Sequence, residues 1–437
     1  MSERRRRVLI VSHVFPPAVA GGAPRMGQFA RLLPEFGWDV TVLTARRAGG
    51  VDGSARDKLA GRATIVDAWA PAPPAALGGR GAPVPKRGLR GLARKTLRTA
   101  AMSIVFPDRE VFWVPGAIAA GKRALAEVAH DVVFATHGPA SDLVVGRALA
   151  RGAKLPLVVD FRDLWSMLPM PIFTTPLHRA AAHRLERSVI RRASRLVAVA
   201  PNMAADLAAE HGLASERAIS ITNGFDPDDA ARARDARPVA NGHAHPFRLL
   251  YTGSIHAHYD LDPFWRAVRA LAAAGRITPE TLRIEFVGNL AVSDLASLGV
   301  APFVDVRPFV AHDRVFDELG RADALLMIET PGYYARYSYA AKVFDYLLTG
   351  KPVLALVERG GNTARLLDEA GVGYLAEPGD EAQIRAALER VLAQKGAPPR
   401  VVDCEAAPLG AFNRRNLVRR LAAMLDDVAA TEPRGRW

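Results

Sequence analysis

Two loops in this sequence combine glycines with a basic residue in a pattern suited to binding an anion. The first loop, FPPAVAGGAPR, follows the apolar run 8–11 and contains Gly21, Gly22 and Arg25. Glycine lets backbone amides approach a ligand closely, and the N-terminus of a following helix favours phosphate. Arg25 adds a fork of hydrogen-bond donors. We therefore predict that this loop approaches a phosphate group, although two adjacent glycines are also common in plain turns.

The second candidate is the stretch YSYAAKVFDYLLTGKPVLAL, in which Lys342 and Asp345 are three residues apart. We predict a helix here that is capped by Ser338 and carries both side chains on one face. A cation near the start of a helix suits a diphosphate, and a carboxylate one turn later suits ribose hydroxyls. An ordinary surface ion pair has the same spacing, but the position after the apolar run 324–328 and the loop ETPGYYARY favours a ligand site.

The elements that position these loops are short apolar runs that alternate with helical patterns along the chain. Such runs are apolar on both faces, as in a parallel sheet that is covered by helices. The predicted strands are 8–11, 40–43, 132–136, 157–161, 196–200, 219–222, 249–252, 284–287, 324–328 and 353–357. This alternation predicts an α/β fold with two Rossmann-like doubly wound domains.

The length of 437 residues also indicates two domains, because single hydrophobic cores stop growing near ~250–300 residues. We predict an N-terminal domain over residues 1–225, a linker over 226–246 and a C-terminal domain over 247–410. The linker prediction rests on a stretch that is rich in Asp, Arg, Gly and Pro and has weak apolar periodicity. Residues 411–437 are predicted to contain a final helix that belongs to either domain, including by packing back on the first.

The formal net charge of +13 favours anionic partners such as nucleic acid, anionic lipid or phosphorylated small molecules. An arginine-rich composition throughout the chain explains this charge equally well. Residues 77–106 form a basic insertion with no acid from Lys86 to Arg98, which predicts either a membrane-surface segment or a solvated insertion. Since the basic tract lacks interleaved aromatic residues, we expect no binding of nucleic acid.

Cys404 is the only cysteine, so no intramolecular disulfide can form and a reducing compartment is expected. No apolar run approaches the ~18–20 residues that span a bilayer. The apolar stretch after MSERRRR is too short for a secretory signal peptide. We therefore expect a cytoplasmic protein, located at the inner face of the plasma membrane if the basic insertion binds lipid.

The ordered set of motifs resembles the large GT-B glycosyltransferase family that includes the retaining family-four enzymes. Matching pieces occur in the family's order over nearly the whole chain: VSHVFPPAVAGGAPR, PLVVDFRDLWS, ITNGFDP, LLYTGSI, FVGN, KVFDYLLTGKPVLAL and GGNTARLLDEAGVG. The tract PDREVFWVPGA also resembles branches associated with bacterial surface polysaccharides. The resemblance implies that the C-terminal domain binds a nucleotide-sugar donor, that the N-terminal domain binds the acceptor, and that the two domains face a cleft where the reaction occurs.

The resemblance also assigns residues to the donor. Asp345 occupies the second acidic position of the family's paired-glutamate motif, where the side chain binds ribose hydroxyls, whereas Tyr337 stands at the first acidic position. Gly253, Ser254 and Lys342 are the implied neighbours of the diphosphate. Many members carry an Arg and a Lys after the GS segment, and this chain lacks both. We hypothesise that Lys342, together with the arginine of the first loop, supplies the missing cations.

The acceptor side departs from the family as well, because Arg162 stands where the usual histidine of the catalytic region is expected. We predict that Asp163 accepts a hydrogen bond from the acceptor hydroxyl and that Arg162 orients the sugar or the acceptor. His137 is an alternative acid–base residue, and an ordinary loop histidine is an equal reading of it. The implied chemistry retains the anomeric configuration through an oxocarbenium-like transition state, with phosphate stabilisation as the main contribution.

We expect no cofactor and no metal, with the nucleotide sugar as a co-substrate. Asp226/Asp228 and Asp260/Asp262 read DxD, a metal-binding pattern in a different glycosyltransferase fold, but their contexts in the linker and after the TGS turn do not fit. The expected acceptor is a growing polysaccharide or a lipid-linked saccharide. Two other functions stay open, namely a nucleotide-sugar epimerase or hydrolase of the same fold, and a noncatalytic sugar-nucleotide-binding protein or membrane scaffold.

Overall fold

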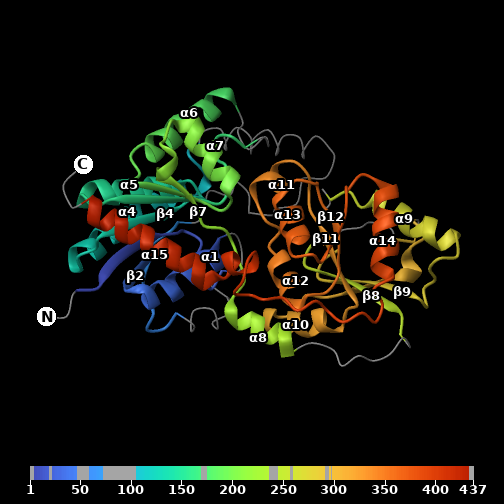
Figure 1. Cartoon of the computed structure of the whole chain (residues 1–437). Helices are drawn as coiled ribbons and strands as arrows, with labels where there is room; N and C mark the ends of the chain where they lie inside the picture. Colours follow the sequence, from blue (N-terminus) through green and yellow to red (C-terminus); the bar gives the residue numbers. More distant parts are fainter. Residues whose placement is uncertain are drawn as a thin grey trace. The chain divides into compact units, whose positions relative to one another are not determined.

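The computed structural model describes most of the chain as two units, each built on its own parallel sheet (Figure 1). The described residues are 4–18, 22–46, 59–71, 105–168, 175–235, 245–255, 259–290, 295–296 and 298–432. Unit 1 comprises residues 1–222 with 418–437, and unit 2 comprises residues 223–417. Of the basic insertion predicted at 77–106, residues 77–104 lie outside the described part of the chain.

Unit 1 is a seven-stranded parallel sheet in the order β3-β2-β1-β4-β5-β6-β7. Its strands are β1 Arg6–Val11, β2 Trp38–Ala45, β3 Ala63–Ala68, β4 Val132–Thr136, β5 Leu157–Phe161, β6 Arg195–Ala198 and β7 Ala218–Ser220. Its helices are α1 Ala23–Leu32, α4 Val114–Glu127, α5 Ser141–Ala153, α6 Pro176–Ile190 and α7 Pro201–His211, with short 3-10 helices at Leu33–Phe36, Arg109–Trp113 and Ser215–Arg217. The central strands β4 and β5 are buried along their whole length because helices cover both faces.

The last helix, α15 Arg414–Thr431, returns to unit 1 with most of its length. Asp426 forms an ion pair with Arg6 at the start of β1, and Asp427 forms one with Arg195 at the start of β6. These contacts attach the C-terminal end of α15 to the sheet of unit 1. No helix within the described ranges combines the length and the apolar character that crossing a membrane requires.

Unit 2 is a six-stranded parallel sheet in the order β10-β9-β8-β11-β12-β13. Its strands are β8 Phe247–Thr252, β9 Leu282–Val287, β10 Val304–Arg307, β11 Ala324–Ile328, β12 Val353–Leu356 and β13 Gly373–Ala376. Its helices are α8 Pro227–Asp235, α9 Asp262–Ala273, α10 His312–Arg321, α11 Tyr333–Tyr337, α12 Val343–Thr349, α13 Asn362–Glu369 and α14 Glu381–Leu392, with 3-10 helices at Ala301–Phe303 and Leu409–Phe412. Leu249 and Tyr251 pack toward α9 and α14, whereas Leu250 between them packs toward α10 and α12.

The prediction of two doubly wound parallel sheets is confirmed, and each of the ten predicted strands is present. The structure adds β3, β10 and β13, which the sequence analysis missed. All three are edge strands, and most of their residues are partly exposed. An edge strand that is not covered on both faces lacks the continuous apolar run by which the other strands were recognised.

The stretch predicted as the linker 226–246 contains a helix, since residues Pro227–Asp235 form α8. Ala233 is buried in the core of unit 2, which explains how so polar a segment becomes ordered. Residues 236–244 lie outside the described part of the chain. The first DxD pair begins this helix, because the carboxylate of Asp226 accepts a hydrogen bond from the backbone N–H of Asp228 at 3.1 Å.

Candidate functional site

In unit 2, the turn after β8 and the start of α12 bring together three of the predicted donor residues. The Nζ atom of Lys342 donates a hydrogen bond to the hydroxyl of Tyr251 and lies 3.8 Å from the centroid of that ring. The same hydroxyl donates to the carbonyl oxygen of Ser254 at 3.1 Å. Gly253 has a φ of +113°, and a Cβ there would lie 3.3 Å from the Lys342 Nζ atom. Glycine at position 253 therefore permits both the positive φ of the turn and the close approach of the Lys342 side chain.

The side chain of Lys342 is partly buried, and no carboxylate within the described ranges forms an ion pair with it. Burial lowers the pKa of Lys342 to about 7, while the charge of Asp345 opposes this shift. Asp345 lies in the first turn of α12 and is partly exposed. An anionic group bound beside Tyr251 would restore the favourable charge interaction that burial removes. The turn and the lysine together are thus suited to a phosphate-bearing ligand.

The start of the helix at α12 differs from the sequence prediction in two details. Ser338 does not cap the helix that carries Lys342, because it ends α11 and its hydroxyl donates to the carbonyl of Tyr334 at 2.8 Å. Lys342 itself is the residue before α12. Tyr337, predicted to bind the donor, is the last residue of α11 and packs within it, with its ring centroid 5.3 Å from that of Tyr333.

In unit 1, the loops after β1, β4 and β5 gather around Arg162. Its Nε atom donates to the carbonyl of His137 at 3.0 Å, and its Nη2 atom donates to the carbonyl of Gly138 at 2.7 Å. A Cβ on Gly22 would lie 2.2 Å from Nη1, and a Cβ on Gly138 would lie 2.2 Å from Nη2. The guanidinium group therefore fills the space between two glycines, next to the start of α1. Gly21 lies outside the described residues.

We expect Gly22→Ala to displace the Arg162 side chain and to lower turnover by about 10- to 100-fold, since small misplacements of an orienting group have costs of this order. Gly152→Ala is the matched control, because a Cβ at that position meets no atom within 4 Å. Initial rates and thermal denaturation of both variants would check this. Equal rates for both variants would show that the packing of Arg162 against Gly22 has no effect on turnover.

Arg25 does not present its guanidinium to a ligand, contrary to the sequence prediction. Its side chain is 5% exposed and forms an ion pair with Asp160 of β5, with 2.7 Å between Nη2 and Oδ1. Its Nη1 atom donates to the carbonyl of Thr222 at 3.0 Å, and its Cζ atom lies 4.7 Å from the centroid of the Phe29 ring. Arg25 is the third residue of α1 and faces the sheet, so it attaches this helix to β5.

The two predicted acid–base candidates have different surroundings. His137 is 7% exposed and stacks on Phe161, with 5.3 Å between ring centroids. Burial lowers the pKa of His137 to about 4, so the ring is neutral at pH 7 and is a weak base. Asp163 is exposed, so solvent screens the partial desolvation that raises its pKa, and we expect an ionised carboxylate at neutral pH. Asp163 is therefore the more accessible of the two candidates.

The sequence analysis missed the residues of α6 that hold the FRDLWS segment. The carboxylate of Glu186 accepts hydrogen bonds from the backbone N–H of Ser166 at 2.9 Å and from its hydroxyl at 2.8 Å. Arg179 donates to the carbonyls of Ser166 and Leu168 at 3.1 and 3.0 Å. Arg179 and Glu186 are seven residues apart and share a helix face. They fix the segment that carries the predicted Arg162 and Asp163.

Glu186 also belongs to a group with His183 and His211, whose ligand atoms lie within 4.8 Å of one another. This group does not fit a metal ion. Glu186 already accepts bonds from Ser166 and from His211, the latter at 2.8 Å. The rings of His183 and His211 are stacked with 29° between their planes, so their in-plane lone pairs do not converge on one point. The carboxylate of Asp260, in the second DxD pair, is also occupied within the chain, because it accepts a hydrogen bond from the backbone N–H of Asp262 at 3.0 Å.

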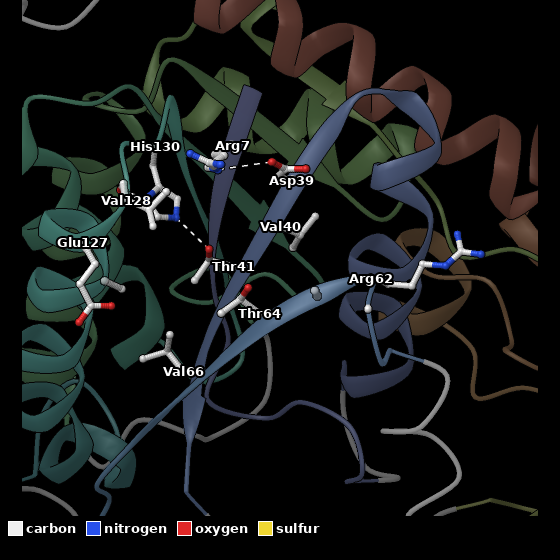
Figure 2. A pocket seen from close by; sticks show the side chains of 13 residues that line it. Arg7, Asp39, Val40, Thr41, Arg62, Thr64, Val66, Glu127, Val128 and His130 are labelled. Atoms are coloured by element: carbon white, nitrogen blue, oxygen red, sulfur yellow. Dashed lines mark hydrogen bonds and ion pairs between the residues drawn. The ribbon is translucent and has the colours of Figure 1, made fainter. Parts of the chain in front are cut away.

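A cavity of about 370 Å³ lies in unit 1 between the amino ends of β1–β3 and the end of α4 (Figure 2). The imidazole of His130 bonds to the hydroxyl of Thr41 at 2.9 Å and to the carbonyl of Val128 at 2.8 Å. Arg7 forms an ion pair with Asp39 across 3.4 Å. Among the described residues, none of the sequence-predicted site residues lines this cavity. Ligands of open α/β sheets bind at the carboxyl ends of strands, so we place the candidate site there instead.

Two doubly wound units with glycine turns at the carboxyl ends of their strands define this chain as an α/β protein of the GT-B class. Residues 19–229, slightly less than half of the chain, match the family model of Glycosyltransferase Family 4. This match agrees with the resemblance drawn from the motifs over that range, and the finer surface-polysaccharide type stays a prediction.

A curated relative is D-inositol 3-phosphate glycosyltransferase 1 of Catenulispora acidiphila, which is 30% identical over 280 residues. The alignment covers 58% of this chain and 62% of the relative, which is less than two thirds of its length.

Two solved structures show the same fold over nearly the whole chain. A glycosyltransferase from Rickettsia africae ESF-5 has a TM-score of 0.61 at 11% identity, covering 98% of this chain and 99% of that chain. The α,α-trehalose 6-phosphate synthase from Burkholderia multivorans has a TM-score of 0.61 at 14% identity, covering 99% of both chains. At these identities the likeness extends to the fold alone.

Proposed function

We propose that this protein is a glycosyltransferase that moves a sugar from a nucleotide-sugar donor to an acceptor hydroxyl. The observation that carries the proposal is the partly buried Lys342 ammonium beside the Gly253 turn, at the carboxyl end of β8. A cation that is partly desolvated and forms no ion pair with a carboxylate of the described residues favours a bound anion over solvent. In this proposal Lys342, Gly253 and Ser254 contact the diphosphate, and Asp345 accepts hydrogen bonds from ribose hydroxyls.

Unit 1 supplies the acceptor side in this proposal. Arg162 orients the sugar or the acceptor, and Asp163 accepts a hydrogen bond from the attacking hydroxyl. Because Arg162 is held by two backbone carbonyls, its charge is fixed before a ligand arrives. Fixed charges of this kind stabilise charge that develops in a transition state. We propose a retaining and metal-independent reaction, with the cations of the protein stabilising the leaving diphosphate.

We further propose that the acceptor is a growing polysaccharide or a lipid-linked saccharide and that the protein works in the cytoplasm, at the inner face of the plasma membrane. The net charge of +13 and the basic residues between 86 and 98 support contact with an anionic membrane. The segment 86–98 itself lies outside the described residues.

The test of the donor assignment is a thermal-denaturation screen with UDP-, GDP-, dTDP- and ADP-sugars, since a ligand that binds the folded state raises its stability. The donor that binds is then offered to membrane extracts, and the products are analysed by mass spectrometry. A new glycoside supports the proposal. An altered free or nucleotide-linked sugar would instead indicate an epimerase or hydrolase, and binding without turnover would indicate a noncatalytic protein.

We expect Asp163→Asn to lower kcat by about 100-fold or more, because the amide cannot take part in proton transfer from the acceptor. The dissociation constant of the donor should stay unchanged, since the donor-binding residues belong to unit 2. Steady-state rates and calorimetric donor titrations would check both statements. Asp368→Asn, an exposed change on α13, is the control with normal rates. Normal turnover of the Asp163 variant would remove this residue from the mechanism.

Donor affinity is expected to fall as pH rises above about 7, because burial lowers the pKa of Lys342 to about 7 in the free protein. A bound diphosphate stabilises the protonated amine, so binding takes up a proton above this pH and the dissociation constant rises toward about tenfold per pH unit. Titration with a nucleotide sugar between pH 6 and about 9 would measure the slope. Lys342→Arg should give a flat profile, because arginine stays charged throughout this range. A flat profile for the unaltered protein would contradict the prediction.

A further inference from the structure

Glu329 directly follows β11, a central strand of unit 2, and one of its carboxylate oxygens accepts no hydrogen bond from the described part of the chain. The residue is 6% exposed. Its Oε1 atom accepts a hydrogen bond from the hydroxyl of Thr363 at 2.8 Å. Its Oε2 atom is buried and has no hydrogen-bond partner among the described residues. A buried carboxylate oxygen without a partner costs about 1–3 kcal/mol, so its presence calls for an explanation.

The surroundings of Glu329 connect it to the donor-binding turn. Thr363 also accepts a hydrogen bond from the backbone N–H of Ala340 at 3.0 Å, two residues before Lys342. Burial raises the pKa of Tyr259, and the negative charge of Glu329 raises it further, so the two side chains lie near each other. Tyr259 follows the turn after β8. Glu329 thus lies among the loops that follow β8, β11 and β12, at the carboxyl edge of the sheet. This is the edge at which ligands of such sheets bind.

The chemistry of the free oxygen narrows the choice of ligand group. A carboxylate repels phosphate, and Lys342 with the Gly253 turn already suits the diphosphate. Asp345, one turn into α12, is the carboxylate proposed for ribose. Glu329 is a second carboxylate, connected through Thr363 to the segment on the other side of Lys342 in the chain. The remaining part of a nucleotide sugar that offers hydroxyl donors is the sugar.

We propose that Glu329 is a donor-specificity residue, whose free carboxylate oxygen accepts a hydrogen bond from a hydroxyl of the transferred sugar. This inference rests on the proposed function, because it deepens the assignment of the same site. Glu329 then distinguishes nucleotide sugars by the position of one hydroxyl, since a site built to bind a hydroxyl rejects an analogue that lacks it.

The test compares nucleoside diphosphates with the matching nucleotide sugars, using UDP/UDP-glucose, GDP/GDP-mannose, dTDP/dTDP-glucose and ADP/ADP-glucose. In Glu329→Gln, the amide oxygen still accepts the bond from Thr363, and only the free carboxylate oxygen is lost. Burial raises the pKa of Glu329 to about 7, so the side chain is only partly ionised at neutral pH. For the pair that the protein binds, we therefore expect the dissociation constant of the nucleotide sugar to rise about tenfold, the upper end for a neutral hydrogen bond. The dissociation constant of the diphosphate should not change.

Glu358→Gln is the matched control. Glu358 is a partly buried carboxylate in the loop after β12 that accepts a bond from the N–H of Gly332. This variant should leave the ratio of the two dissociation constants as it is in the unaltered protein. If Glu329→Gln does not fold, Glu329→Asp keeps the charge and moves the carboxylate, and it should show the same loss confined to the nucleotide sugar.

The outcomes separate the inference from the proposed function. If the unaltered protein binds no member of any pair, the donor-binding proposal fails and the role of Glu329 fails with it. If the unaltered protein binds a pair and the Glu329 variants lower both affinities equally, or neither, the glycosyltransferase proposal stands and the role of Glu329 is overturned. A merely structural role would lower the melting temperature without changing the ratio.

Discussion

Replacing Lys342 with methionine is expected to weaken binding of the nucleotide-sugar donor by about 100-fold. The lysine is the buried cation next to the Gly253 turn, and a hydrogen bond to a charged group contributes about 1.5–3 kcal/mol. Methionine is of similar length and packs on the Tyr251 ring without a buried charge, so the fold should be as stable or more stable. Isothermal titration of the donor and thermal denaturation would measure both effects.

Lys351→Met is the control for the Lys342 variant, because Lys351 is a second buried lysine in the same unit. Its Nζ atom donates to the carbonyls of Gly320 and Ala322, and burial lowers its pKa to about 8. Its loss should lower stability and leave the donor affinity unchanged. The reverse pattern, with donor binding kept in Lys342→Met and lost in Lys351→Met, would overturn the assignment of the diphosphate site.

Replacing Arg25 with methionine is expected to lower the free energy of unfolding by about 3–5 kcal/mol, because Asp160 would be left as a buried charge without its partner. Chemical denaturation followed by circular dichroism would measure the loss. Arg62→Met is the control: Arg62 forms an exposed pair with Glu35 across 3.4 Å, and its loss should stay within about 1 kcal/mol.

The Arg25 variants also separate the two interpretations of this residue. If Arg25 were a phosphate ligand, as its sequence context suggested, the methionine variant would keep its stability and lose affinity for phosphorylated ligands. In Arg25→Met/Asp160→Asn the buried charge is absent, and part of the stability should return. A double variant no more stable than Arg25→Met would show that the ion pair is not the source of the loss.

The sequence predicted the covered strands and one edge strand, β7, but missed the other three edge strands, for one physical reason. A strand such as Val132–Thr136 is buried on both faces and is apolar throughout. Ala63–Ala68 pairs with a neighbour on one side only, and it contains an exposed threonine and a partly exposed aspartate. Its apolar residues do not form a continuous run, so only the pairing with β2 identifies it as a strand.

For the site, the sequence located the loops better than the directions of their side chains. The rule that ligands bind at the carboxyl ends of parallel strands placed Gly253 and Lys342 at one edge of the sheet, and the structure brings them into contact. The same rule could not show that Arg25 faces the sheet. Asp160 was a usable signal, since a charge inside the run LVVDF requires a buried partner.

The packing of Arg162 between Gly22 and Gly138 restricts which substitutions homologues of this protein can carry at these positions. A broad planar cation fits only while both neighbours end in a hydrogen atom, so the three positions are expected to covary. A lineage that exchanges the arginine for a shorter side chain frees position 22 to acquire alanine or serine. Position 138 would keep its glycine even then, because its φ of +106° excludes most other residues.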